Sequence, residues 1–211
     1  MHLLFDLDGT LTDPKPGILT CIKYALTHLD APIPPDDELV GYIGPPLQQS
    51  MASLLRTDNA ARVAEAVALY RERYATTGLY ENEVNPGIVP ALRHLRAQAD
   101  SIHVATSKPA IYARRIMDHF GLSEFFDGVY GSELDGVRSD KTELIAYLLE
   151  REKIPSGLST MIGDRSHDVI GARGNGVRPL GVLWGYGSRE ELIMAGADGV
   201  CDAPEMLHSL L

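Results

Sequence analysis

Short apolar runs separated by amphipathic segments restrict the fold of this 211-residue chain more than any other feature. Three of the intervening segments, 88–99, 110–120 and 141–152, place apolar residues on one face at the 3.6-residue helical period. The apolar runs are typical of strands buried on both faces. Strands that alternate with helices predict an α/β fold, a Rossmann-like parallel sheet core with helices on both faces. The runs are 3–7, 102–105, 128–130, 161–162, 180–184 and, as a short edge strand, 199–201.

Residues 14–85 interrupt this alternation and have a mostly helical pattern. Their apolar faces comprise Ile18, Ile22, Ala25 and Leu29, and then Val63, Val67, Tyr70 and Tyr74. Tyrosines at this spacing pack between helices more often than they bind ligands. Proline and glycine mark both borders, at 13–17 and 82–87, which is typical of hinges around an insertion. We therefore expect a core domain, 1–13 with 86–211, and an inserted α-helical cap domain, 14–85.

The charge balance excludes several classes of partner. Asp and Glu number 29 against 19 Lys and Arg, so the formal net charge is −10. An acidic chain lacks the clustered cations that bind a nucleic-acid polymer or an anionic membrane. The N-terminus has no cationic leader and no run is long enough to span a membrane, so we expect a cytoplasmic protein. No obligate protein partner is evident. Cys21 and Cys201 are expected to be small core residues, with a single disulfide left open.

The most specific string is Asp6-Leu7-Asp8-Gly9-Thr10, at the end of the first apolar run. Aspartates two apart on an extended segment point to the same side. A glycine directly after them favours a loop whose backbone N–H groups face an anion. A strand that runs into an Asp-Gly turn is the plainer interpretation of Asp-x-Asp alone. The full string, directly after an apolar N-terminal run, is much more specific than that.

This string resembles the first motif of the haloacid dehalogenase (HAD) superfamily, in the phosphatase branch whose helical cap follows the first strand. Three further motifs of that family then follow in order: Thr106-Ser107 closing a strand, Lys141 opening a helix, and Asp164 with Asp168 after another strand. The resemblance extends over nearly the whole chain, to Gly185-Tyr186-Gly187. Together with a Gly-Pro-Pro turn at 44–46, the pattern is similar to phosphoglycolate phosphatases and to HAD-type 5′-nucleotidases.

The motifs imply a magnesium site. A phosphate monoester is an anion, so a carboxylate approaches it only where a cation neutralises that charge. Mg²⁺ prefers oxygen ligands in octahedral geometry. The expected ligands are Asp6, the backbone carbonyl of Asp8, Asp164 and, directly or through water, Asp168. His167 is expected to be a polar residue at a helix start and not a ligand.

The same motifs imply a division of catalytic roles. Asp6 is the expected nucleophile, which forms an aspartyl-phosphate intermediate. Asp8 is the expected general acid and base, which protonates the leaving oxygen and then activates water. The groups expected to hold the transferring oxygens are Lys141, the Thr106 hydroxyl, and backbone N–H groups near Gly9 and Ser107.

These expectations describe a Mg²⁺-dependent phosphomonoester hydrolase acting on a small phosphorylated metabolite. Phosphoglycolate and nucleoside monophosphates both stay open as substrates. A sugar phosphomutase with the same core and cap is the nearest alternative, because it returns the phosphoryl group to its substrate. A non-catalytic phospho-aspartate signalling module is less favoured, since such modules lack an acid two residues after the acceptor and a cap of this length. Taken singly, Lys141, Thr106, Asp164 and Asp168 also fit ordinary roles at helix or strand ends.

Overall fold

The computed structural model describes all residues from Met1 to Leu211 and divides the chain into two compact units. The core unit comprises Met1–Asp13 and Val84–Leu211, and the inserted unit comprises Pro14–Glu83. The second boundary lies two residues before the position expected from the Pro-Gly pattern. No helix in either unit is both long enough and apolar enough to cross a membrane.

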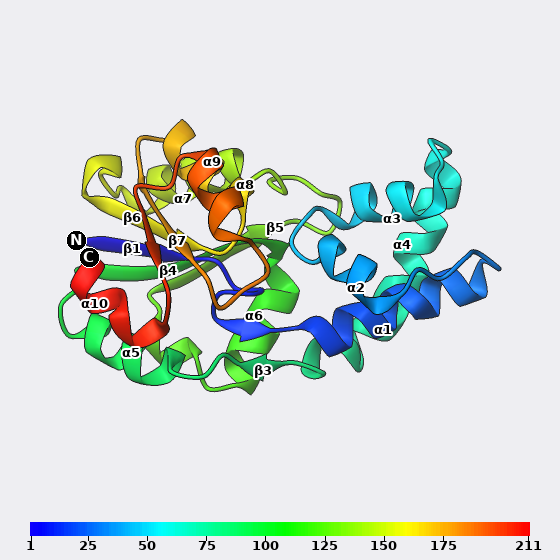
Figure 1. Ribbon diagram of the computed structural model, residues 1–211, viewed down its shortest axis with the longest axis horizontal. Helices are drawn as coiled ribbons and strands as arrows, with labels where there is room; N and C mark the ends of the chain where they lie inside the picture. Colours follow the sequence, from blue (N-terminus) through cyan, green and yellow to red (C-terminus); the bar gives the residue numbers. More distant parts are fainter. The chain divides into compact units, whose positions relative to one another are not determined.

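The core unit is built on a six-stranded parallel sheet with the order β5-β4-β1-β6-β7-β8 (Figure 1). Every apolar run that the sequence marked as a strand is one, including the short edge strand. The first strand ends two residues before the predicted Leu7, because the Leu7 carbonyl instead accepts the N–H groups of Leu11 and Thr12 in a tight loop. The strands are β1 (His2–Phe5), β4 (Ser101–Pro109), β5 (Gly128–Ser132), β6 (Ser159–Gly163), β7 (Arg178–Val182) and β8 (Gly199–Cys201).

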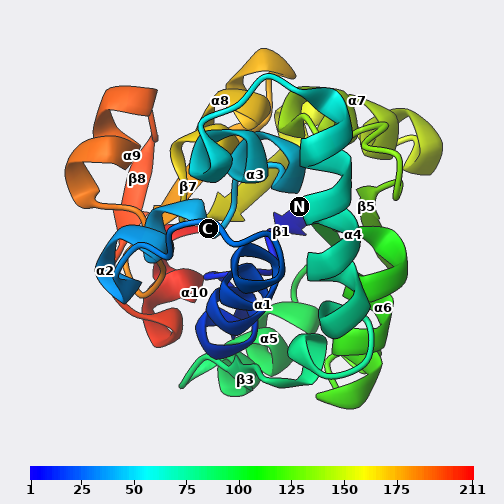
Figure 2. The same cartoon turned by 90° about the vertical axis from the view of Figure 1, so that its right-hand side faces the viewer.

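Helices cover both faces of this sheet, as predicted. On one face lie α7 (Lys141–Glu152) and α8 (Ser166–Gly174). On the other lie α5 (Ile88–Arg96), α6 (Ala110–His119) and α10 (Leu207–Leu210) (Figures 1 and 2). The helix α9 (Arg189–Ala195) packs beside α8 and the edge strand β8. Three short 3-10 helices complete the unit: η3 (Ser123–Phe125), η4 (Ser156–Leu158) and η5 (Pro204–Met206).

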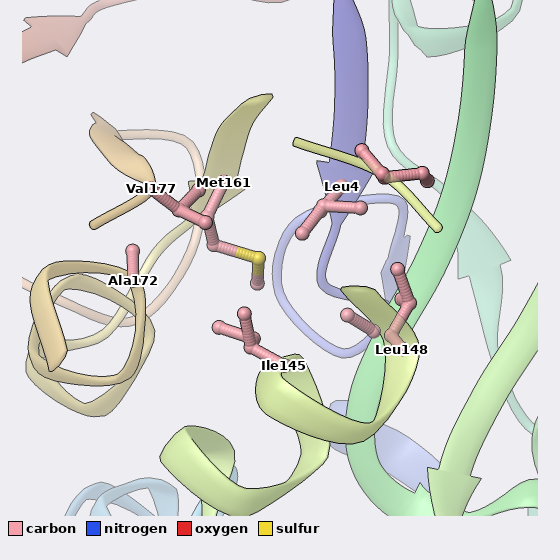
Figure 3. Packing of buried hydrophobic residues seen from close by; sticks show 8 residues of the cluster. Leu4, Ile145, Leu148, Met161, Ala172 and Val177 are labelled. Carbon is pink, nitrogen blue, oxygen red and sulfur yellow. The ribbon is translucent and has the colours of Figure 1, made fainter. Parts of the chain in front are cut away.

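A buried apolar cluster fixes β1, β4 and β6 against α7 and α8. Leu4 and Met161 extend from adjacent central strands toward Ile145 and Leu148 of α7 (Figure 3). Ala172 of α8 and Val177 close the cluster on the β7 side, and all of these side chains are at most 2% exposed. Burial on this scale is the main source of stability for such a layer. The cluster therefore holds rigidly the strand ends that bear the motif residues.

The inserted unit is helical, as the amphipathic pattern predicted. Its helices α1 and α3 both pack against α4. Tyr70 and Tyr74 of α4 are buried and stack with ring centroids 5.2 Å apart, so the tyrosine stripe serves helix packing. Arg73 and Glu81 form a two-armed ion pair at 2.7 and 2.8 Å that ties the end of the unit to α4. The elements are α1 (Lys15–His28), α2 (Asp36–Leu39), η1 (Val40–Tyr42), α3 (Leu47–Leu55), α4 (Ala60–Tyr74) and η2 (Gly78–Tyr80).

Two short strands occur where the chain leaves and re-enters the core. They are β2 (Thr12–Asp13) and β3 (Glu83–Val84), and they pair in a two-stranded sheet. Cys21 and Cys201 are both buried, and the disulfide that the sequence left open is not formed. The carboxyl ends of β1, β4 and β6 meet at one edge of the parallel sheet, where ligands bind in folds of this class.

Candidate active site

The loop after β1 places Asp6 and Asp8 at the carboxyl edge of the sheet. The Asp6 N–H still donates to the Ile162 carbonyl at 2.9 Å, which aligns the residue with the end of β6. Gly9 has a φ of +86°, a conformation that side chains disfavour, and its N–H donates to the Thr12 carbonyl at 2.7 Å. The turn thus holds both carboxylates in place, with Asp6 4% and Asp8 9% exposed.

Lys141 is the cation at the centre of the site. It is the first residue of α7, whose start is fixed by the Asp140 side chain accepting the Thr142 and Glu143 N–H groups. Its ammonium donates to Asp6 Oδ1 at 2.8 Å and to the Ala105 carbonyl at 2.8 Å, and it lies 2.7 Å from Asp168 Oδ1. Burial alone would lower the pKa of Lys141, but these two carboxylates outweigh it and raise that pKa above the ordinary lysine value.

Three buried carboxylates lie close together here, and two of them, Asp6 and Asp168, contact this lysine. One oxygen each of Asp6, Asp164 and Asp168 lies within 4.8 Å of the others. Burial raises the pKa of Asp164 to about 8, and the carboxylates of Asp168 and Asp6 add to that effect. Burial also raises the pKa of Asp6, against the opposing pull of Lys141, whereas Lys141 overcomes burial and lowers the pKa of Asp168. One ammonium facing three carboxylates leaves the cluster short of positive charge.

Glycines make the close packing around Asp164 possible. A Cβ on Gly9 or Gly185 would lie 2.4 Å from Asp164 Oδ2, and one on Gly187 would lie 1.8 Å from the Asp164 carbonyl oxygen. Backbone and hydroxyl donors reach the same carboxylate: the Tyr186 N–H at 2.8 Å and the Thr10 hydroxyl at 3.1 Å. The loop after β7 therefore fixes the position and rotation of this side chain.

Asp8 has a partner that the motif pattern did not assign. Lys108 donates to Asp8 Oδ1 at 2.6 Å, and the two side chains are only 6% and 11% exposed. Thr106 is buried near the end of β4, where its hydroxyl accepts the Lys108 N–H at 3.2 Å, and the Ser107 carbonyl accepts the Ser132 hydroxyl at 2.8 Å. Lys108 directly follows Thr106-Ser107 in the sequence, so its residue type was known, but the direction of its side chain was not.

Two residues between Asp164 and Asp168, Arg165 and Ser166, fix the start of α8. The Arg165 N–H donates to Asp168 Oδ2 at 3.1 Å, and its guanidinium donates to Glu191 Oε1 at 3.0 Å. The same Glu191 oxygen accepts the Ser166 N–H at 2.8 Å. Burial lowers the pKa of His167, which favours its neutral form, and His167 is not in the carboxylate group. Glu191 was not singled out from sequence, since it lies on α9, more than 20 residues further along the chain.

The structure brings together Asp6, Asp164, Asp168 and Lys141. The Asp8 carboxylate lies outside that group and pairs with Lys108. Asn85 also contributes, because its amide donates to the Gly9 and Thr10 carbonyls at 3.2 and 3.1 Å. About 75 residues separate these partners in the sequence, and no local pattern marks such a contact.

The donor set fits Mg²⁺. All three converging groups are carboxylates, the hard oxygen ligands that this ion prefers, and no histidine or cysteine joins them. Burial, with the neighbouring carboxylates of Asp168 and Asp6 adding to it, raises the pKa of Asp164, and a bound divalent ion would oppose both effects. The residues present are therefore suited to such an ion.

The parallel sheet with helices on both faces and a buried carboxylate cluster at its carboxyl edge define a Rossmann-like α/β protein. Comparisons with known proteins identify its family. Residues 3–182 match the model of the haloacid dehalogenase-like hydrolases. The chain is 48% identical over 191 residues to a 5′-nucleotidase of Pseudomonas aeruginosa, covering 90% of this chain and 86% of that protein. It superposes on the crystal structure of a predicted phosphatase from Clostridium acetobutylicum with a TM-score of 0.94 and 39% identity, covering 99% and 96% of the two chains.

A third relative is named as a kinase and not as a phosphatase or nucleotidase. The chain is 39% identical over 186 residues to the tyrosine-protein kinase PtkA of Mycobacterium tuberculosis, covering 88% of this chain and 62% of that longer protein. The chain belongs to the haloacid dehalogenase-like hydrolase family. It is an enzyme, a phosphatase of that family.

Proposed function

We propose that this phosphatase hydrolyses small phosphate monoesters through an aspartyl-phosphate on Asp6, with Mg²⁺ as its cofactor. The observation that supports this most directly is the separation of the two aspartates of the β1 loop into different surroundings. Asp6 contacts Lys141 within the carboxylate cluster, whereas Asp8 contacts Lys108 outside it. Two carboxylates in different environments can take two different roles in one reaction.

The reaction has two steps in which the same groups exchange roles. First, an Asp6 carboxylate oxygen attacks phosphorus, the ester P–O bond breaks, and the leaving oxygen takes a proton from the Asp8 carboxyl group. Water then attacks phosphorus and gives a proton to the Asp8 carboxylate, while the bond between phosphorus and Asp6 breaks. Inorganic phosphate leaves, and both aspartates return to their starting forms.

Positive charge around the cluster is needed for an anionic substrate to approach Asp6. Asp6, Asp164 and Asp168, with the Asp8 backbone carbonyl, would hold the Mg²⁺, which supplies neutralisation of the phosphate charge. Lys141 keeps Asp6 oriented and contributes the protein's own positive charge. The Thr106 hydroxyl and the N–H groups near Gly9 and Ser107 are the proposed donors to the phosphoryl oxygens.

Nucleoside 5′-monophosphates are the proposed substrate class. The support is the 48% identity to a protein named 5′-nucleotidase, over most of both chains. Phosphoglycolate is the second candidate, on the resemblance of the motif pattern. A relative named as a kinase is 39% identical over 186 residues, so product analysis is the measurement that identifies the acceptor of the phosphoryl group.

The test is a comparison of purified wild-type protein with Asp6→Asn and with a matched control, Asp58→Asn, at an exposed aspartate. With Mg²⁺ and a panel of nucleoside monophosphates, phosphoglycolate and sugar phosphates, wild type and the control release inorganic phosphate. Asp6→Asn loses on the order of a thousandfold or more in kcat, because the attacking group is gone. Wild-type turnover by Asp6→Asn would contradict the proposed nucleophile.

The identity of the product separates the alternatives. Free phosphate indicates hydrolysis, an isomerised sugar phosphate indicates a mutase, and a stable phosphoprotein without turnover indicates a signalling module. Asp8→Asn is expected to accumulate phosphate on Asp6, since the group that activates water is missing. Peptide mass spectrometry of acid-quenched protein locates that phosphate.

Metal binding has its own test, independent of activity. Addition of Mg²⁺ at 100 times its Kd is expected to raise the wild-type Tm by about 5–10 °C, because the ion binds only the folded state. Asp164→Asn removes a ligand and loses most of this rise, while Asp58→Asn keeps it. An equal rise in all three proteins would contradict the proposed ligand set.

A further inference from the structure

We infer that Lys108 is a positioning residue for Asp8, and that a bulge in β4 built by Gly131 and Ser132 aims it there. The inference rests on the proposed function, since it concerns the group that exchanges protons with the leaving oxygen and with water. The motif pattern gave Lys108 no role. Its contact with Asp8 joins residues 100 positions apart in the chain.

The bulge is visible in the pairing of β4 with β5. Thr106 pairs with Gly131 and Pro109 pairs with Ser132, so two extra residues of β4, Ser107 and Lys108, are accommodated between adjacent positions of β5. Bulges bend a strand and redirect its side chains, and they recur beside active sites. Here the bulge directs the side chain of Lys108 to the loop that follows β1.

Two hydrogen bonds and one glycine hold the bulged segment in shape. The Thr106 hydroxyl accepts the Lys108 N–H at 3.2 Å, and the Ser132 hydroxyl donates to the Ser107 carbonyl at 2.8 Å. Gly131 makes room, because a Cβ there would lie 2.4 Å from the Lys108 carbonyl oxygen. The backbone of Lys108 is therefore fixed on both sides, and its long side chain needs little further ordering.

The contact itself determines which oxygen of Asp8 is free to react. Lys108 Nζ lies 2.6 Å from Asp8 Oδ1, in a pair of side chains only 6% and 11% exposed. An ion pair shielded to this degree is worth more, and is geometrically stricter, than one on the surface. By holding Oδ1, Lys108 sets the rotation of the carboxyl group and leaves Oδ2 to give or take the proton. Lys108 thus acts through Asp8 and need not touch the substrate.

Leaving-group dependence distinguishes this role from a structural one. Phenyl phosphate and p-nitrophenyl phosphate are similar in shape, but phenolate is the stronger base and needs a proton more as it departs. In Lys108→Met, kcat/KM for phenyl phosphate is expected to fall at least about tenfold further than for p-nitrophenyl phosphate, because proton donation is impaired. Lys108→Arg keeps a donor of similar reach and is expected to restore most of this difference.

A double-mutant cycle gives the second readout, which a folding defect would not reproduce. In the Asp8→Asn background, Lys108→Met is expected to cause less than about a twofold further loss, because residues that act as a unit are non-additive. Ser132→Ala, which only loosens the bulge, is expected to show a weaker form of the Lys108→Met pattern. The matched control is Lys153→Met, at an exposed lysine about 18 Å along α7 from Lys141.

The outcomes separate failure of this inference from failure of the proposed function. Equal losses on both aryl phosphates in Lys108→Met, or additive losses in the cycle, overturn the role of Lys108. If Lys108→Met loses equally on both aryl phosphates while Asp8→Asn loses more on phenyl phosphate, the proposed function is supported and only the role of Lys108 is wrong. If Asp8→Asn also lacks that dependence, the assignment of Asp8 is wrong, and the inference about Lys108 falls with it.

Discussion

Asp6 and Asp8 lie two residues apart, yet each is held by a different lysine. Lys141 reaches Asp6 from the first turn of α7, and Lys108 reaches Asp8 from the end of β4. The sequence predicted that both aspartates and Lys141 belong to one site, because strand ends of a parallel sheet meet at one edge. It did not predict the contact of Lys108 with Asp8, since the direction of the Lys108 side chain depends on a bulge that no residue pattern indicates.

A buried histidine gives a prediction at the residue scale. His103 of β4 is 1% exposed, and neither ring nitrogen has a hydrogen-bond partner. Burial lowers the pKa of His103 from its ordinary value of 6.5, although Glu152 and Asp127 oppose this. The unfolded chain therefore takes up a proton at this residue below about pH 6.5, while the folded protein stays neutral there. The stability contribution is present above that pH and is lost as the pH falls toward the folded-state pKa.

The measurement is the free energy of unfolding in urea between about pH 7.5 and pH 5.5, for wild type and His103→Leu. The variant is expected to lose less stability than wild type as the pH falls, since its unfolded state has one fewer group to protonate. Parallel curves for the two proteins would show that His103 contributes nothing to the pH dependence.

At the scale of elements, loops between distant helices and strands complete the site. The loop between β7 and α9 closes around Asp164, with the Tyr186 N–H on its carboxylate and the Trp184 ring N–H on the Thr10 carbonyl at 2.8 Å. The sequence predicted the strands from their apolar runs and the helices α5, α6 and α7 from apolar periodicity. It noted Gly185-Tyr186-Gly187 only as the end of the family pattern, because contacts between loops have no period.

The glycines of this loop provide the element-scale prediction. Gly185→Ala would place a Cβ 2.4 Å from the Asp164 carboxylate, whereas Gly157→Ala, in η4, meets no atom within 4 Å. Gly185→Ala is expected to displace Asp164, to lower the free energy of unfolding by about 1–3 kcal/mol and to weaken the Tm rise caused by Mg²⁺. Gly157→Ala changes neither by much. Urea unfolding measures the free energy of unfolding, and thermal melts with and without Mg²⁺ measure the Tm rise. Equal values for the two variants would contradict the proposal that Gly185 is needed to position Asp164.

At the scale of the molecule, the core contains every residue proposed for the chemistry. Asp6, Asp8, Lys141, Asp164 and Asp168 all lie in Met1–Asp13 or Val84–Leu211. The core also fixes both ends of the insertion, because the Asn85 N–H donates to the Leu11 carbonyl at 3.0 Å. The Asn85 amide adds the contacts to the loop after β1 described above. The sequence predicted the insertion from its Pro-Gly borders and helical period.

Excision of the inserted unit tests this independence. Replacement of residues 14–83 by a short Gly-Ser linker is expected to leave a core that unfolds cooperatively and keeps its Mg²⁺-dependent Tm rise. The matched control adds Asn85→Ala, which removes the side-chain donor to the Gly9 carbonyl and one of the two donors to the Thr10 carbonyl, and is expected to cost about 1–3 kcal/mol. Circular dichroism and thermal melts measure both. A shortened protein with helix content but no cooperative transition would show that the core depends on the insertion.

The pairing of β2 with β3 brings the entry and exit of the insertion together. An insertion whose ends are neighbours in space can lengthen, shorten or be exchanged through changes at two junctions only. The segments on either side, which bear the proposed nucleophile and the remaining carboxylates of the cluster, stay unchanged in such an exchange. Exchange of the insertion therefore needs recombination at two junctions in the gene, and both junctions lie outside the residues proposed for the chemistry.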